Sequence, residues 1–479
     1  MTVQEVRGSQ PELEVYDDSM DTEKYLEKPP PVEDPFGNEE SGEVKYRSGG
    51  SQFNIIAGKL ECLWLLKTSH LVSCLYHLPW QLSGLSRKKS HLDSGIVYGT
   101  LNISSALILI LGLSGISWYT GYIFCQFKLR FPQVHSMGDA GELILGPIGR
   151  EICYFGQLLF IIFLMASHIL TFTVTFNTIT NHGTCTIVFG VVGLVACSIA
   201  SLPRTSGKVF LMSTISAASI LIATIVTMIS VAVQSPADVV NDITTHPTFV
   251  NGFLAVTNIV FAFIAHVSFF GIISEMEDPR QFPKSLAMLQ VVDTTMYIVA
   301  AMVIYCYVGP DVSSPALSAA GPVMKKVAYG LAIPTVIVAG VVFGHVACKY
   351  IYVRIFRGER SHHMHQRSLL ATGTWVAICL STWTIAWVIA ESIPVFNDLL
   401  SLISALFGSW FSYGLPAMFW FYMNKGQLWS TPKKIFLTLV NLFIFGVACA
   451  ICGLGLYVSG KSIHDSSANS SWTCANNAV

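Results

Sequence analysis

The chain has 479 residues, of which 52% are hydrophobic and only 12% are charged, and its formal net charge is −1. This composition excludes an ordinary soluble globular protein and indicates that lipid surrounds most of the chain. Helices of roughly 20 residues each would leave room for about ten or eleven membrane spans.

The first fifty residues differ from the rest of the chain. Residues 1–47 hold 13 of the 29 acidic residues. They also contain the triplet Pro29, Pro30 and Pro31 and few aliphatic residues, so this stretch cannot bury enough apolar surface to fold. We therefore predict that residues 1–50 form a disordered, acidic cytoplasmic tail, without a cleavable signal peptide.

Ten apolar runs follow, each long enough to be a membrane-spanning helix. Backbone groups in hydrocarbon must be satisfied within the spanning structure, and the runs lack the alternation of barrel strands, so helices are predicted. The predicted spans are residues 96–125, 152–178, 185–202, 209–233, 252–275, 287–308, 327–353, 370–393, 399–422 and 435–459. Fifteen Lys and Arg residues lie in one set of alternate loops and only three on the other side, which makes the first set cytoplasmic and residues 460–479 extracellular.

Ten spans with an outside C-terminus would place the acidic tail outside as well. One more crossing within residues 51–95 would return the tail to the cytoplasm. That region is a poor span, because Glu61, Lys67, His70 and His77 interrupt its apolar stretch and charges are costly at that depth. We predict an aberrant first-helix region at 51–95, followed by a transporter domain at 96–459.

Several long strings carry a family resemblance. They are DPFGNEESGEVKYR at 34–47, TGYIFCQFKLRFPQVHSMGDAGELILGPIGRE at 120–151, FLAVTNIVFAFIAHVSFFGIISEMEDPRQFPKSLAMLQ at 253–290, VFGHVACKYIYVRIFRG at 342–358 and GSWFSYGLPAMFW at 408–420. In these strings the chain resembles the fungal neutral amino acid permeases. Those proteins belong to the amino acid/auxin permease family, within the amino acid–polyamine–organocation superfamily.

The resemblance implies an all-α polytopic membrane protein with the inverted-repeat transporter fold. Here that would mean ten clear helices plus a degenerate first one, with the first and sixth helices broken near the midplane. Half-helix ends can offer N–H and C=O groups to a zwitterion. The implied function is proton-coupled uptake of neutral amino acids, large or aromatic ones among them. The partners would be an amino acid, protons and the lipid bilayer, with no cofactor, nucleic acid or enzymatic turnover. The expected location is the plasma membrane, with the vacuolar membrane as the alternative.

The first helix departs from the family, which has a glycine-rich segment resembling MIAETISLGILSLPS at this point. Codons exist for residues 60–86 that read GMLMVAEDISLGVLSLPSAMATVGLV in a shifted frame. Our hypothesis is a frame error or mis-splicing in the gene model. Two alternatives to transport follow. The chain could be a transport-inactive product of that error, or it could be a sensor that binds amino acids without transporting them. A sensor would be expected to have a long cytoplasmic signalling extension, and a tail of about fifty residues is short for that.

The centre of the span predicted at 252–275, which is the sixth helix when the degenerate first one is counted, is the leading candidate for the substrate site. We predict a break near Ala265, where the family typically has glycine, whose backbone meets the substrate. His266 lies within an aromatic run, and we predict that Phe261, Phe263 and Phe269 line the side-chain pocket. A continuous helix with a hydrogen-bonded histidine is the alternative.

Other polar residues interrupt the apolar runs. Ser167, Thr171 and Ser409 are further substrate-binding candidates, although small hydroxyls also join helices. Asp293, inside its span, is the candidate for proton coupling together with His266, because intramembrane carboxylates often mark ion pathways. A structural hydrogen bond is the alternative for Asp293.

The remaining histidines and cysteines suggest no metal site. His362, His363 and His365 lie in an arginine-rich cytoplasmic loop without a carboxylate or cysteine partner, so a solvated loop is predicted. Cys185 and Cys474 are both predicted outside, where disulfides persist. Whether these two cysteines bridge stays open.

Overall fold

The computed structural model describes residues 103–203, 209–234, 248–276, 278–308, 315–356, 368–467 and 471–477. Within these ranges nine helical segments are long and apolar enough to cross a membrane, and a tenth, shorter apolar helix is α4. The elements are α2 (Ile103–Arg130), α3 (Met137–Thr180), α4 (Thr186–Ala200), α5 (Val209–Gln234), α6 (Phe249–Ala262), η3 (His266–Ser268), α7 (Phe269–Glu275), η4 (Pro279–Gln281), α8 (Phe282–Val308), η6 (Ala316–Ala319), α9 (Pro322–Ile355), α10 (Leu369–Ser392), α11 (Phe396–Ile403), η8 (Ser404–Gly414), α12 (Leu415–Met423) and α13 (Pro432–Ser467). Each of the ten predicted spans overlaps a described helix, with residues 96–102 of the first span outside the described part of the chain, and the all-α polytopic fold is confirmed.

Helix α3 is longer than the predicted span at 152–178. It begins at Met137, where Ser136 and Asp139 form a capping box that satisfies the first backbone N–H groups. Gly146 has φ 71° and ψ −160° and is followed by Pro147, so the helix turns a corner there. Residues 137–151 were expected to lie in a loop, because the long apolar run begins only at residue 152.

The span at 252–275, the sixth helix when the degenerate first one is counted, is interrupted, as predicted. Helix α6 ends at Ala262, a three-residue 3₁₀ turn begins at His266, and α7 begins at Phe269. The break therefore covers residues 263–265. The span formed by α11, η8 and α12 is also irregular, because its middle portion from Ser404 to Gly414 is a π-helix.

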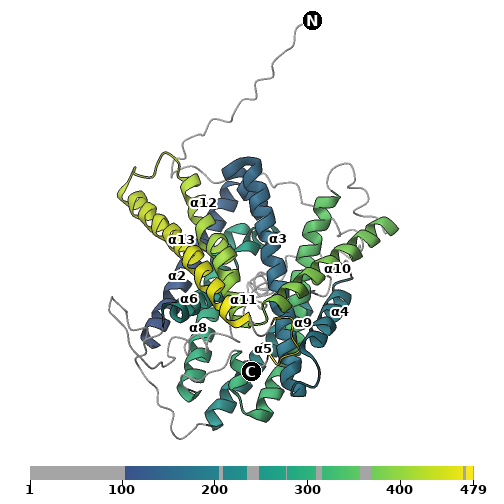
Figure 1. Cartoon of the computed structure of the whole chain (residues 1–479). Helices are drawn as coiled ribbons and strands as arrows, with labels where there is room; N and C mark the ends of the chain where they lie inside the picture. Colours follow the sequence, from purple (N-terminus) through teal and green to yellow (C-terminus); the bar gives the residue numbers. More distant parts are fainter. Residues whose placement is uncertain are drawn as a thin grey trace, which may run out of the picture.

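The helices gather in two groups. Figure 1 shows α3, α4, α9 and α10 on one side of the bundle and α2, α6 and α8 on the other. Within the first group, Gly340 and Gly344 of α9 admit the ring of Trp383 from α10. Close approach of this kind is typical of membrane helices, which pack through small residues.

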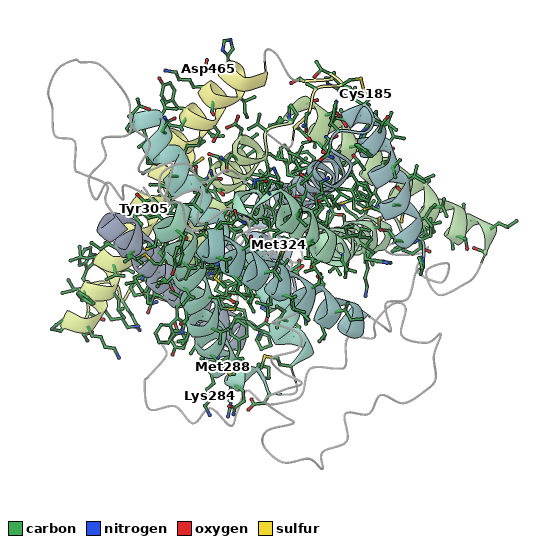
Figure 2. All side chains as sticks on the ribbon, turned by 90° about the horizontal axis from the view of Figure 1, so that it is seen from below. Cys185, Lys284, Met288, Tyr305, Met324 and Asp465 are labelled. Carbon is green, nitrogen blue, oxygen red and sulfur yellow. A yellow bond between two sulfur atoms is a disulfide. The ribbon has the colours of Figure 1, made fainter. Side chains whose placement is uncertain are left out.

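One end of the helix bundle carries a short C-terminal strap, which we define as residues 471–477. Cys185, directly before α4, is joined to Cys474 in a disulfide with a Cα–Cα distance of 4.4 Å (Figure 2, near the Cys185 label). The Thr186 hydroxyl donates to the Ala475 carbonyl at 2.6 Å, and Asn477 donates to Thr173 of α3 at 2.8 Å. The disulfide that the sequence left open is therefore present, and the strap connects α3 with α4.

Candidate functional site

Neighbouring helices satisfy the backbone of the break. The Tyr297 hydroxyl from α8 donates to the Ala262 carbonyl at 3.4 Å, and the Ser117 hydroxyl from α2 donates to the Phe263 carbonyl at 3.3 Å. Unpaired buried carbonyls are costly, so these two donors let α6 end inside the helix bundle. The break is therefore held from the side of α2 and α8.

His266 is fully buried and turned toward α2. Its Nε2 atom lies 3.0 Å from the Thr120 hydroxyl and 3.0 Å from the Ser117 carbonyl oxygen. Its ring packs against Phe124 and Phe269, with centroids 5.6 and 4.8 Å away. His266 thus connects the break to α2, and its ring is packed between aromatic side chains.

The predicted aromatic residues are all buried around the break. Phe263 meets the Tyr297 ring edge-on at 5.8 Å, and Phe269 meets Phe124 edge-on at 5.9 Å. Phe261 is 1% exposed. These rings pack the broken helix against α2 and α8, and their part in substrate binding stays a prediction.

The π-helix η8 approaches the break from another side. A methyl group at Gly408 would overlap the Ile264 side chain, so glycine permits this close approach. The Ser409 hydroxyl donates to the Ala405 carbonyl at 2.7 Å, within its own helix. Widened helical turns of this type occur often at functional sites.

The two hydroxyl candidates on α3 also bond within their helix. Ser167 donates to the Leu164 carbonyl at 2.8 Å, and Thr171 donates to the Ser167 carbonyl at 2.7 Å. Both side chains are buried. As with Ser409, no contact described here connects them to the break, and their role in binding stays a prediction.

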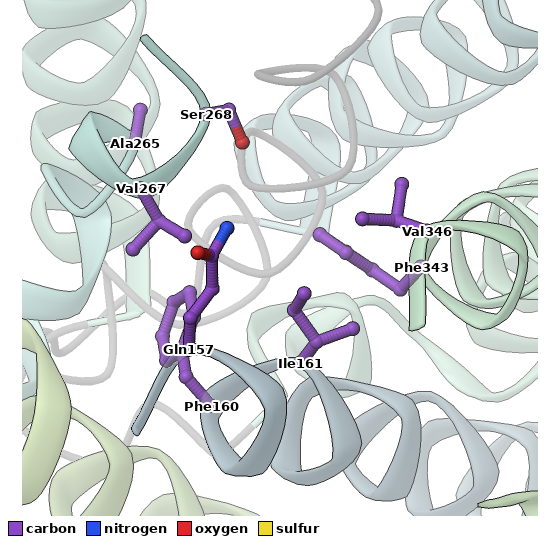
Figure 3. Close-up of a pocket in the computed structure, with 8 residues that line it drawn as sticks. All are labelled: Gln157, Phe160, Ile161, Ala265, Val267, Ser268, Phe343 and Val346. Atoms are coloured by element: carbon purple, nitrogen blue, oxygen red, sulfur yellow. The ribbon is translucent and has the colours of Figure 1, made fainter. Parts of the chain in front are cut away.

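A small pocket of about 30 Å³, open on one side, lies between α3, the break and α9. Figure 3 shows its eight lining residues. The lining is mostly apolar, with Gln157 and Ser268 as its polar members, and the described residues contribute no charged side chain to it. The lining residues are Gln157, Phe160, Ile161, Ala265, Val267, Ser268, Phe343 and Val346. Mostly apolar walls with a few polar groups are typical of small-molecule sites.

Asp293 lies elsewhere, on the buried face of α8. Gln290, Thr294 and Tyr297 are buried on the same helix. Ser114 of α2 accepts a hydrogen bond from Gln290 at 2.9 Å and lies 2.7 Å from the Thr294 hydroxyl. Asp293 is 3% exposed. It follows Gln290 by three residues and precedes Tyr297 by four, so these three residues share one face of α8. The tyrosine is the residue whose hydroxyl donates to the end of α6.

Helix α7, which follows the break, contacts the loop between α2 and α3. His135 Nδ1 lies 3.2 Å from the Ser274 hydroxyl of α7 and 3.3 Å from Lys128 Nζ, which also donates to the Val134 carbonyl at 2.6 Å. Burial lowers the pKa of His135 from 6.5, nearby Lys128 lowers it further, and Asp139 opposes both. A lowered pKa favours the neutral ring, whose Nδ1 can accept these hydrogen bonds.

Of the residues predicted to bind substrate, Ala265 lies in the described pocket lining. The sequence analysis missed Gln157, Phe160, Ser268 and Phe343. For Gln157 a signal existed, because it is an amide inside the apolar run at 152–166. The predicted loop histidines His362, His363 and His365, and the whole first-helix region, lie outside the described residues.

Comparisons with known proteins found a family model, relatives and solved structures to which the chain is similar. Residues 103–459 match the family model described as transmembrane amino acid transporter protein. The chain is 34% identical over 379 residues to the N amino acid transport system protein of Neurospora crassa, covering 77% of this chain and 80% of that protein. It is 31% identical over 366 residues to a transmembrane transporter of Fusarium pseudograminearum, covering 74% and 76% of the two chains. Among solved structures, a manganese transporter of Eremococcus coleocola is similar over 91% of this chain and 99% of its own, at 12% identity and a TM-score of 0.37.

Proposed function

Because this chain belongs to the transmembrane amino acid transporter family, we propose that it moves neutral amino acids across the membrane together with protons. It is an amino acid transporter rather than an enzyme, and a multi-pass membrane protein. The observation that carries the proposal is the pocket between α3, the break and α9, with its apolar and aromatic walls.

The chemistry of the walls supports the neutral class of substrate. Phe160, Ile161, Phe343 and Val346 would contact the side chain of the amino acid. An ionised side chain would lose its hydration there, and no charged residue of the described lining would compensate for it. Large apolar and aromatic side chains are therefore the proposed cargo, with Ala265 as the contact from the break.

Asp293 and His266 are the proposed proton carriers. Asp293 is buried in the membrane region beside the polar cluster of α2 and α8, where its charged form is costly. Tyr297, four residues further along α8, bonds the end of α6. Protonation of Asp293 would thus act close to the backbone that forms the break, and His266 lies on the same α2 side.

A second candidate is a transport-inactive product, and one observation favours it. The family match begins at residue 103, which supports the interpretation that residues 51–95 do not resemble the family's first helix. The proposed location of an active form is the plasma membrane, with the vacuolar membrane as the alternative.

Uptake in permease-deficient yeast tests these proposals. Cells would express the chain as given, or the chain with residues 60–86 replaced by the shifted-frame sequence, and would receive radiolabelled phenylalanine or leucine with and without a protonophore. We expect the replaced chain to accumulate both amino acids and the protonophore to abolish the accumulation. A replaced chain that reaches the membrane without giving uptake above empty cells would contradict the proposed function, and uptake by the chain as given would contradict the inactive product.

A further inference from the structure

The pocket contains one deeply buried side chain whose polar end is directed into it. Gln157 of α3 is 9% exposed and lines the pocket. Its amide oxygen accepts a hydrogen bond from the Tyr350 hydroxyl of α9 at 3.1 Å. Its amide nitrogen has no hydrogen-bond partner within the described part of the chain, and Figure 3 shows that nitrogen directed toward the middle of the pocket.

The Tyr350 hydroxyl pairs with the oxygen end of the Gln157 amide. A hydroxyl that donates to the amide oxygen leaves only the two N–H donors of the amide for the pocket. The reversed amide would instead donate to the Tyr350 hydroxyl oxygen and turn its own oxygen toward the pocket, an arrangement that the structure does not show. The pocket therefore presents a hydrogen-bond donor at this point.

Tyr350 is itself held in place by its neighbours. Its ring stacks on Tyr154 of α3 at 4.2 Å and 14°, and the Tyr154 hydroxyl donates to the Tyr350 carbonyl at 3.1 Å. The Arg354 guanidinium lies over the Tyr154 ring at 4.1 Å and pairs with Glu151. This stack joins α3 and α9 and holds the Tyr350 hydroxyl at the amide of Gln157.

We propose that the Gln157 amide donates a hydrogen bond to the carboxylate of the amino acid, and that Tyr350 is the positioning residue that fixes this donor. The inference rests on the proposed transport of neutral amino acids. An amide donor suits a carboxylate and offers nothing to an ammonium group. A hydrogen bond to a charged group in a water-poor pocket is strong enough to select for that group.

The test measures how well unlabelled phenylalanine and phenylalaninamide, which lacks the carboxylate, compete with radiolabelled phenylalanine for uptake by the full chain. If the given chain is inactive, the version with residues 60–86 replaced is used. Gln157→Glu keeps an acceptor for Tyr350 but turns the donor into a negative charge. We expect its KM for phenylalanine to rise about tenfold or more and its preference for the acid over the amide to disappear.

Tyr350→Phe keeps the ring stack and frees the amide to turn. We expect KM to rise severalfold with Vmax unchanged, and the preference for the acid over the amide to weaken. Tyr457→Phe, on an exposed face of α13, is the control and should match the unsubstituted chain. An unchanged KM and preference in both Gln157→Glu and Tyr350→Phe, at equal surface expression, would overturn the inference while leaving the proposed function intact. Absence of uptake by the unsubstituted chains would overturn both.

Discussion

Three buried side chains hold the break in the sixth helix: Ser117, Thr120 and Tyr297. Two of them donate to the carbonyls at the end of α6, and Thr120 lies against His266. Ala265 has φ −133°, a value open to residues that carry a side chain, so this break does not require glycine. The alanine that stands in place of the family's glycine is therefore compatible with the broken helix.

A substitution of Asp293 tests its proposed role in proton coupling. Asp293→Asn keeps the shape of the side chain and removes its ability to take up and release a proton. We expect accumulation of phenylalanine against its gradient to be lost, while exchange of internal for external phenylalanine persists. Uptake is compared with exchange in proteoliposomes with an imposed pH gradient. Accumulation that still follows the pH gradient in this variant would exclude Asp293 as the proton carrier.

The loop histidine His135 should make stability depend on pH. Its pKa is lowered from 6.5 in the folded protein, mainly by burial and then by Lys128. The unfolded chain therefore binds more protons just below pH 6.5, and the free energy of unfolding falls as the pH drops through this window. In His135→Gln the thermal midpoint in detergent should fall less between neutral pH and mildly acidic pH.

His464→Gln is the matched control for this measurement, because that side chain is 88% exposed at the end of α13. It should keep the pH dependence of the unsubstituted protein. Equal pH profiles for His135→Gln and the unsubstituted protein would contradict the role assigned to His135.

At the scale of elements, hydrophobic runs located the membrane helices but not their irregular parts. Each of the ten predicted spans overlaps a described helix, because twenty apolar residues in lipid leave the backbone few other solutions. The corner at Gly146 and the π-helix η8 were not predicted, since they depend on contacts between segments. The break at residues 263–265 was predicted from the family resemblance, whereas the donors that permit it lie about 35 and 146 residues away in sequence.

The corner in α3 depends on two facing glycines. A methyl group at Gly149 would overlap the Gly141 carbonyl oxygen, and one at Gly141 would lie 2.5 Å from the Gly149 carbonyl oxygen. Gly149→Ala should therefore force the two arms of the corner apart and lower stability by about 1–3 kcal/mol. The thermal midpoint of the purified protein in detergent measures this loss.

Gly446→Ala in α13 is the matched control, because a methyl group there meets no atom within 4 Å. Alanine is a better helix former than glycine by about 0.5–1 kcal/mol, so this variant should be as stable as the unsubstituted chain or more stable. A Gly149→Ala variant with an unchanged midpoint would show that the corner does not rest on these glycines.

The same limit applies to the candidate site. The resemblance identified the break, and hence Ala265 at the edge of the pocket. Gln157, Phe160 and Phe343 come from two other helices, and only the packing of α3 against α9 brings them together with the break. A single apolar run carries no information about which of its faces meets which partner, so sequence patterns alone could not select these residues.

At the scale of the whole molecule, the disulfide and the charge pattern agree on orientation. Disulfides persist on the oxidising side of a membrane, and the fifteen-to-three bias of Lys and Arg predicts the C-terminal tail on that side. The bridge also closes a chain segment with a sequence separation of 289 residues. It therefore restricts the unfolded chain strongly.

Replacing Cys185 and Cys474 by serine should lower stability by about 2–4 kcal/mol and free the C-terminal strap from α4. Thermal unfolding in detergent measures the loss, and a thiol-reactive mass tag applied before and after reduction reports the bridge itself. Cys449→Ser, which removes an exposed free thiol, is the control. The same tag count with and without reduction in the unsubstituted protein would contradict the bridge.

The central claim is that neutral amino acids bind in the pocket between α3, the break and α9. Val346 lines this pocket and is 38% exposed, so a cysteine there would be open to a small thiol reagent. The measurement is the rate of modification of Val346→Cys in membranes, with Cys62, Cys74, Cys306, Cys449 and Cys452 replaced by alanine. Val323→Cys, 72% exposed at the start of α9, is the control. Saturating phenylalanine should slow modification at residue 346 severalfold and leave residue 323 unaffected, whereas an unchanged rate at residue 346 in a protein that still transports phenylalanine would contradict the claim.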